Sequence, residues 1–235
     1  MQTTTNCDES PAGSTRTLRF VDWLSAELET EEASTKGDRR RLALKLAAAR
    51  LLEDRGYDDF STRDVSDAAN VTRTALYLYY PSKQVLVLEL LQDFQRFMME
   101  KLRPSRKGMS MAEAALETNR TYVRFFAINA RIILSIQYVR RNLSDAEKLQ
   151  FDLNDWWAHK VARAISGRTT VQQRSSHPSK QALATAYALE GMIDSFLTEL
   201  YVRRNPNLVA LNLSEEAVAK LLTRLWLGAL KGSEP

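Results

Sequence analysis

Cysteine and histidine are scarce in this chain of 235 residues, and each shortage removes a class of function. The single cysteine, Cys7, excludes an internal disulfide and disfavours a thiolate metal site. The two histidines, His159 and His177, do not stand at metal-ligand spacing from each other. The sequence also lacks a glycine-rich phosphate loop, a nucleophile elbow and a histidine-based triad. We therefore expect no cofactor, no metal and no enzymatic activity.

Long apolar runs are missing as well. No segment approaches the length of a membrane span, and the first residues, MQTTTNCDESPAG, lack the basic and apolar regions of a signal peptide. Hydrophobic residues make up 44% of the chain and charged residues 26%, which is typical of a soluble globular protein. We expect a cytoplasmic protein without a membrane partner.

The charge is distributed unevenly. The net charge is +4, yet the first 35 residues hold seven acidic and only two basic side chains. A basic body permits nucleic-acid binding without requiring it. Residues 1–35 are predicted to form a separate acidic extension, with residues 1–16 disordered. Within it, Phe20, Trp23, Leu24 and Leu28 share one helical face, which indicates either an amphipathic helix docked on the body or a partly ordered extension. One hypothesis is that its acidic face competes with DNA.

The most informative stretch is STRDVSDAANVTRTALYLYYPSK, residues 61–83. Ser61 is a good N-cap for a first short helix, and Asn70 tolerates the left-handed conformation that ends it. Thr72 caps a second short helix, which Pro81 terminates. Two short helices at this spacing are typical of a helix-turn-helix.

The second of these helices indicates the partner. Leu76 and Tyr80 lie four residues apart and are predicted to face inward. The remaining positions carry hydrogen-bond donors, which suit the acceptor-rich phosphates and purine edges of DNA: Thr72, Arg73, Thr74, Tyr77 and Tyr79.

Residues 39–91 resemble the N-terminal domain of the TetR family of transcriptional regulators. The resemblance is carried by the Arg55-Gly56-Tyr57 turn, the Arg63-Asp64-Val65 run, the Ala68-Ala69 pair, and Leu76-Tyr77 followed by Tyr80-Pro81-Ser82-Lys83. The family usually has glycine where this chain has Asn70, and phenylalanine where it has Tyr80. Both departures are chemically mild.

The resemblance implies roles for individual residues. Arg73 and Thr74, with Arg63 from the preceding helix, are expected to read bases. Thr72, Tyr77, Tyr79 and Lys83 are expected to contact phosphate, and the arginines 39–41 lie at a helix start that the family holds near the DNA backbone. The full predicted DNA-binding set is Arg41, Ser61, Thr62, Arg63, Thr72, Arg73, Thr74, Tyr77, Tyr79 and Lys83.

The rest of the chain shows no strand pattern. The predicted fold is all-α, with about nine helices: a DNA-binding domain over residues 36–81, then a long helix from Ser82 to about Arg103 that opens a helical domain over residues 82–235. Further helices are expected near 110–128, 130–142, 144–166, 179–204 and 214–230, with loops at 167–178 and 205–213. The long fourth helix joins both domains and is the candidate for coupling them.

The family implies an effector cavity in the second domain, although aromatic residues at helical spacing are more often plain core. Glu190 and Asp194 stand in an apolar stripe, and a buried carboxylate requires a partner. Each is therefore paired internally, exposed at the edge of the stripe, or a ligand contact. The predicted effector-binding set is Phe94, Met98, Tyr122, Phe126, Asn129, Trp156, Tyr187, Glu190 and Asp194.

The last two long helices have broad apolar faces. In proteins similar to TetR these helices meet their copies in a four-helix dimer interface, and the alternative is packing within one subunit. The predicted interface residues are Ile193, Phe196, Leu200, Leu221, Leu222, Leu225 and Trp226. The resemblance thus implies a homodimeric repressor of double-stranded DNA, released from a palindromic operator by a small apolar or aromatic effector. The alternative is a helix-turn-helix activator, or a regulator controlled by a partner protein.

Overall fold

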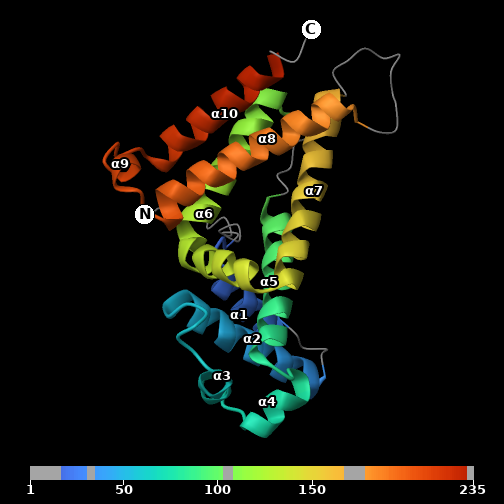
Figure 1. The fold of residues 1–235 in the computed structure, drawn as a ribbon, viewed down its shortest axis with the longest axis vertical. Coiled ribbons are helices and arrows are strands. Elements are labelled where there is room, and N and C mark those ends of the chain that lie inside the picture. Colours follow the sequence, from blue (N-terminus) through green and yellow to red (C-terminus); the bar gives the residue numbers. More distant parts are fainter. Residues whose placement is uncertain (1–16, 31–34, 103–107, 167–177, 232–235) are drawn as a thin grey trace, which may run out of the picture.

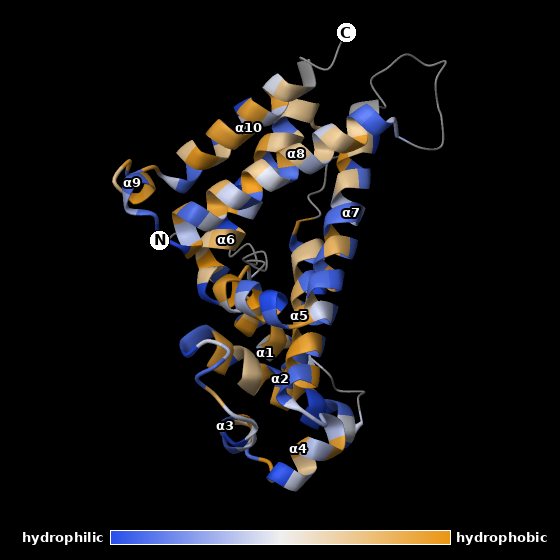
Figure 2. Cartoon of the chain, viewed as in Figure 1, coloured by the Kyte–Doolittle hydropathy of each residue, from blue (hydrophilic) through white to orange (hydrophobic). Residues whose placement is uncertain are grey.

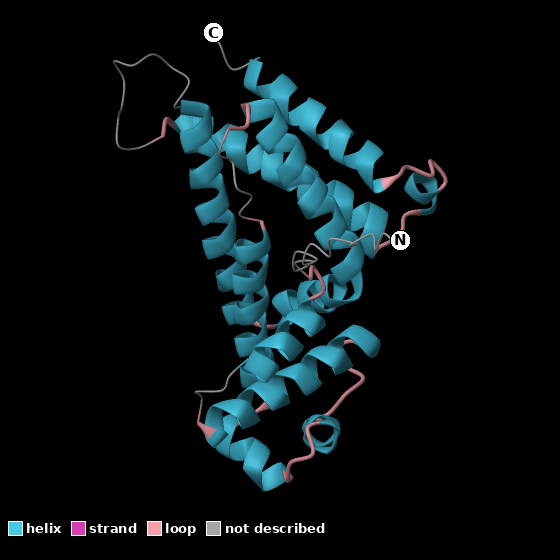
Figure 3. Cartoon of the chain, turned by 180° about the vertical axis from the view of Figure 1, so that it is seen from behind, coloured by secondary structure: helices cyan, strands magenta, loops and turns pink. Residues whose placement is uncertain are grey.

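The computed structural model describes residues 17–30, 35–102, 108–166 and 178–231, and this part of the chain is built from helices and connecting loops without a strand (Figure 3). The expected disorder of residues 1–16 and most of the expected loop at 167–178 lie outside the described residues. None of the described helices is long and apolar enough to cross a membrane.

The molecule is elongated, with the short helices at one end and the last long helices at the other (Figure 1). The elements run in the order α1 (Phe20–Thr30), α2 (Lys36–Asp54), α3 (Thr62–Ala68), α4 (Arg73–Tyr79), α5 (Lys83–Lys101), α6 (Met111–Asn142), α7 (Ser144–Ser166), α8 (Lys180–Leu197), a π-helical turn η1 (Thr198–Val202), α9 (Pro206–Val209) and α10 (Glu215–Lys231).

Side-chain caps fix where the first domain's helices begin. Ser61 accepts a hydrogen bond from the Asp64 amide, and the Asp64 carboxylate accepts one back from the Ser61 amide, which is a complete capping box. Thr72 caps α4 through the Ala75 amide. Between α3 and α4, Asn70 has a φ of 53°, so the predicted left-handed turn is confirmed.

The N-terminal helix α1 is part of the main hydrophobic core. Phe20 and Leu24 are completely buried, and Trp23 is nearly so. The Phe20 ring lies 5.1 Å from Phe94 and 5.6 Å from Phe97 of α5, centroid to centroid. The amphipathic helix expected over residues 17–32 is therefore present, and its apolar face is docked between the two parts of the molecule.

One long helix, α6, replaces the two expected at 110–128 and 130–142. The helix continues through Asn129, where φ is −101° and ψ is 16°, and is kinked there. The Asn129 amide explains why this position is special, because it donates to the carbonyls of Leu18 and Phe125 and accepts from the Phe20 amide. The expected break is a kink at which α1 is fastened.

The expected helix over 179–204 also differs in detail. It is regular to Leu197 and widens into a π-helical turn over Thr198–Val202, where Gln137 of α6 donates to Thr198 Oγ1 at 3.1 Å. The expected loop at 205–213 contains the one-turn helix α9, which Pro206 starts at its first position. Neither feature has a signal in the hydrophobic periodicity.

Besides α1, two long helices connect the DNA-binding end to the rest of the molecule. From α5, Asp93 forms an ion pair of 2.5 Å with Lys45 of α2, and both side chains are largely buried. From α6, Ser135 donates to the Leu52 carbonyl at 3.0 Å and Arg131 donates to the Asp54 carbonyl at 2.5 Å. These contacts join α5 and α6 directly to α2.

Candidate DNA-reading surface and effector cavity

The helix-turn-helix presents α4 at the far end of the molecule (Figure 1). Leu76 and Tyr80 are completely buried, so the prediction that they face inward is confirmed. Arg73, Thr74 and Tyr77 are exposed on the other side. The burial pattern leaves a short row of donors on the outer surface of α4.

A hydrogen bond ties this outer surface to α3. The hydroxyls of Thr62 and Tyr77 lie 3.1 Å apart. The hydrogen bond to Thr62, followed by one to Arg73, lowers the pKa of Tyr77. The structure thus brings Thr62, Arg73 and Tyr77 together across the two helices, as a reading surface requires.

The two outlying arginines of the predicted set are only loosely paired. Arg63 lies 3.7 Å from Asp67, and Arg41 lies 3.4 Å from Glu89. Exposed pairs of this kind contribute about 0–1 kcal/mol and are easily exchanged for a phosphate. Arg41 also lies over the buried Tyr80 ring, at 5.5 Å from its centroid.

Lys83 is engaged inside the protein. Its ammonium donates to the carbonyls of Tyr57 at 2.5 Å and Phe60 at 2.6 Å, and it lies 4.3 Å from the centroid of each of these two rings. Burial lowers the pKa of Lys83. Its predicted contact with phosphate stays a prediction, while its observed contacts hold the loop before α3 against the start of α5.

Sequence reasoning missed one residue of α4. Leu78 is 81% exposed, the most exposed of the large hydrophobic side chains in the described part of the chain. The signal was available, because Leu78 follows the inward-facing Leu76 by two positions and a helix turns by about 200° over two residues. An outward leucine beside base-reading donors is suited to the methyl group of thymine.

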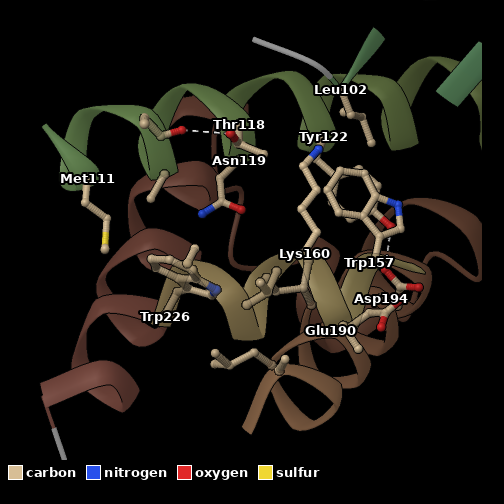
Figure 4. A pocket seen from close by; sticks show the side chains of 18 of the residues that line it. Leu102, Met111, Thr118, Asn119, Tyr122, Trp157, Lys160, Glu190, Asp194 and Trp226 are labelled. Carbon is tan, nitrogen blue, oxygen red and sulfur yellow. Dashed lines mark hydrogen bonds between the residues drawn. The ribbon is translucent and has the colours of Figure 1, made fainter. Parts of the chain in front are cut away.

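Two cavities of the second domain are lined by predicted effector-binding residues. The tryptophan cavity, of about 390 Å³, lies between α6, α7, α8 and α10, with Trp226 at one end and Trp157, Glu190 and Asp194 gathered at the other (Figure 4). The α5 cavity, of about 380 Å³, lies against Phe94 and Met98 of α5. Tyr122, Glu190 and Asp194 line both cavities.

Most of the predicted effector-binding residues line a cavity, and two do not. Phe94, Met98, Phe126 and Tyr187 line the α5 cavity. Asn129 is 1% exposed, and its amide hydrogen-bonds to the backbone of α1 and of its own helix. A buried amide requires such partners. Trp156 lies against Trp157 at 5.0 Å, and it is Trp157 that lines the tryptophan cavity. Neither Asn129 nor Trp156 lines either cavity.

The shared wall of the two cavities carries the acidic groups. Tyr122 Oη donates to Asp194 Oδ1 at 2.5 Å, and Glu190 stands one turn before Asp194 on α8. Burial raises the pKa of Asp194 to about 6, against the opposing effects of Tyr122 and Arg140. Burial, followed by repulsion from Asp194, raises the pKa of Glu190 to about 8. This wall combines a protonated carboxyl group with a second acid in an apolar setting.

Several cavity residues were not predicted. Trp157, Trp226 and Asn119 line the tryptophan cavity, and Arg140 lines the α5 cavity. Asn119 is buried on α6 and donates to Thr223 of α10 at 2.9 Å. The sequence signal for Asn119 was the same as for Glu190, namely a polar residue within an apolar helical stripe.

The predicted dimer residues differ in burial, and Phe196, Leu221 and Trp226 are half-buried. Ile193, Leu200 and Leu222 are at least 92% buried within the subunit and pack inside it. Leu225 is 45% exposed and Met192, which was not predicted, is 36% exposed. In Figure 2, α10 carries hydrophobic and hydrophilic residues in alternation along its length, as an amphipathic helix does. The interface itself stays a prediction.

The fold and the surface of α4 define a helix-turn-helix DNA-binding regulator. Residues 46–90 match the model of the family described as bacterial regulatory proteins, tetR family. Over 210 residues the chain is 23% identical to the HTH-type transcriptional regulator EthR of Mycolicibacterium smegmatis. The aligned region covers 86% of this chain and 91% of that protein. EthR of Mycobacterium tuberculosis is 42% identical over 59 residues, or 25% of this chain and 27% of the relative.

Solved structures agree with this assignment. A TetR-family transcriptional regulator from Syntrophomonas wolfei has a TM-score of 0.61 at 17% identity, and the match covers 84% of this chain and 98% of that one. The flavonoid-responsive regulator FrrA has a TM-score of 0.59 at 20% identity, covering 83% and 97%. Residues 46–90 therefore form a DNA-binding domain of the TetR type, and the relatives that match the wider chain are named as transcriptional regulators.

Proposed function

We propose that this regulator is a homodimeric repressor that leaves a palindromic operator when a small apolar or aromatic molecule binds in its second domain. The observation that carries the proposal is the position of the two cavities. Their walls include Met98 and Phe94 of α5, Leu102 directly after α5, and Tyr122 of α6, and both helices contact α2.

The coupling follows from that shared wall. A ligand between α5 and α8 must displace either the side chains of α5 or α5 itself, because the core around it is close-packed. Asp93 lies one residue before Phe94 on α5, and its ion pair with Lys45 carries any displacement to α2. In a dimer, a tilt of each α2–α4 unit changes the distance between the two reading helices. The ligand would bind the tilted arrangement more tightly than the arrangement that fits DNA, and DNA binding would weaken as a result.

In this proposal Arg73, Thr74 and Arg63 read base edges, and Thr72, Tyr77 and Tyr79 contact phosphate. Leu78 joins them as an apolar contact. Lys83 acts mainly by holding the helix-turn-helix on α5. The dimer forms through the outer faces of α8 and α10, where Met192 and Leu225 are exposed. One short helix reads only a few base pairs, so a two-fold pair is needed for a specific site.

The experiment is selection and sequencing of random duplex DNA bound by the purified full chain, together with its mass in solution. Enrichment of a palindrome by a particle of dimer mass is the expected result. Enrichment of a single half-site by a monomer would contradict the proposal that a homodimer binds a palindromic operator. The sign of regulation is then tested with a reporter gene behind the selected site, where repression is expected and activation would favour the alternative.

The alternative, control by a partner protein, requires a filled second domain. Cavities of about 390 and 380 Å³ argue against it, because spaces of 300–1,000 Å³ are the size that holds small ligands.

A further inference from the structure

The acidic wall between the two cavities contains a carboxylate oxygen without a partner. Glu190 Oε2 is buried and accepts no hydrogen bond from the described residues. Its other oxygen, Oε1, is 3.3 Å from the Asn154 amide when that amide is turned to donate. A buried carboxylate that is half satisfied by a neutral donor either keeps a proton or awaits a cation.

The polar groups around Glu190 make contacts with other residues. From α6, Tyr122 donates to Asp194, and Arg140 attracts Asp194. From α7, Lys160 lies 4.5 Å from the Trp157 ring centroid and 4.7 Å from that of Trp156. On α8, Asp194 adds negative potential to Glu190 and raises its pKa further. The second acid therefore increases the attraction of the site for a positive charge.

Most of the remaining lining of the tryptophan cavity is apolar, with Asn119, Thr118, Ser110 and Lys160 as the polar exceptions. Met111 and Trp226 lie away from the acidic end, and the Trp157 ring stands near the acids (Figure 4). Aromatic faces attract cations as well as apolar groups, and Lys160 places an ammonium over Trp157. The cavity thus offers space for an apolar group at one end and a position lined by two acids and an aromatic ring at the other.

We propose that the effector is a hydrophobic amine, whose apolar body lies between Trp226 and Trp157 and whose protonated nitrogen pairs with Glu190. This inference rests on the proposed function, and it names the chemical class of the molecule that the cavity takes. The amine supplies the hydrogen bond that Glu190 Oε2 lacks and the charge that its ionised form requires.

Three probes of the same shape test the class: 4-phenylbutylamine, 4-phenylbutanol and 4-phenylbutyrate. Binding to the full-length protein is followed by tryptophan fluorescence, since Trp157 and Trp226 line the cavity. The amine is expected to bind about tenfold more tightly than the alcohol, and the carboxylate more weakly than both. Equal affinity of amine and alcohol would overturn the proposal, as would a failure of all three to bind.

Two variants locate the effect. Glu190→Gln is expected to remove the advantage of the amine over the alcohol, whereas Glu190→Asp is expected to keep part of it. Glu29→Gln, which changes an exposed carboxylate on α1, is the matched control. If Glu190→Gln keeps the full advantage of the amine, the assignment to Glu190 is wrong.

Release of a selected operator is measured separately with the same probes. An amine that binds through Glu190 without weakening DNA binding would support the ligand class and contradict ligand-controlled release. An operator released by the alcohol and the amine at equal occupancy would support release and show that the charge is not its trigger.

Discussion

Replacement of Glu190 by glutamine should stabilise the fold, and the gain should depend on pH. The pKa of the folded carboxyl is raised from 4.5 to about 8, mainly because burial disfavours its charged form. Below pH 4.5 the group is protonated in the folded and the unfolded protein, so it has no effect on the free energy of unfolding. Between pH 4.5 and 8 the unfolded chain loses the proton while the fold retains it, and stability falls. Above pH 8 both states are ionised and the loss is constant.

The size of this loss follows from the pKa values. Each pH unit between 4.5 and 8 costs the folded protein about 1.4 kcal/mol, or about 5 kcal/mol over the interval. The Glu190 side chain is only partly buried, and water screens its charge, so we expect about 2–3 kcal/mol. Asp194 has a raised pKa as well, of about 6. It is present in both proteins, and its contribution largely cancels in the comparison.

The assay is urea unfolding of the wild type and of Glu190→Gln at one protein concentration, from pH 5 to pH 9. A fixed concentration is needed because dimer formation would itself shift the midpoint. The difference in free energy of unfolding should be small at pH 5 and should grow to about 2–3 kcal/mol at pH 9 in favour of the glutamine variant. A difference that does not change with pH would refute the assignment of a buried protonated carboxyl. Glu29→Gln should show no such trend.

Three other substitutions test the framework of the molecule. Asn129→Ala should destabilise the fold by about 2–3 kcal/mol in urea unfolding, because the Phe20 amide and the Leu18 carbonyl lose their partner; a loss below about 0.5 kcal/mol would mean that α1 is not fastened there. Asp93→Ala should cost about 3–5 kcal/mol by leaving Lys45 buried without its anion, and Lys45→Met added to it should recover part of the loss. Arg73→Ala should cost about 1–3 kcal/mol of discrimination at one base position of the selected site; unchanged base preference would remove Arg73 from the reading set.

The sequence predicted most of the DNA-binding domain because that domain is specified locally. Capping residues, the left-handed turn at Asn70 and the four-residue spacing of Leu76 and Tyr80 are all readable within one short stretch. The same reasoning predicts a phosphate contact for Lys83, and it gives no sign of the two backbone carbonyls that accept hydrogen bonds from its ammonium in the fold. Those carbonyls, of Tyr57 and Phe60, come from a loop more than 20 residues away.

The cavity residues were harder, since a cavity depends on how several helices pack. Among the polar residues in apolar stripes, Glu190 and Asp194 line both cavities, whereas Asn129 lines neither. The difference lies in the partner: Asn129 meets α1, which begins 109 residues earlier in the chain. Hydrophobic periodicity records which face of a helix is buried, and it does not record what the buried polar group meets.

The docking of α1 has a consequence for how this regulator is tuned. Phe20 and Trp23 pack against aromatic rings of α5. The start of α1 is hydrogen-bonded to Asn129 at the kink of α6, and Arg19 is paired with Glu53 of α2 at 2.6 Å. In the proposed mechanism, a turn of the DNA-reading end against the cavities would strain α1 as well as the contacts of α5 and α6 with α2. The stiffness of α1 would then contribute to the amount of ligand that release requires. Substitutions in α1 would change that amount without altering a proposed base contact or a cavity residue, so sensitivity and specificity would change independently.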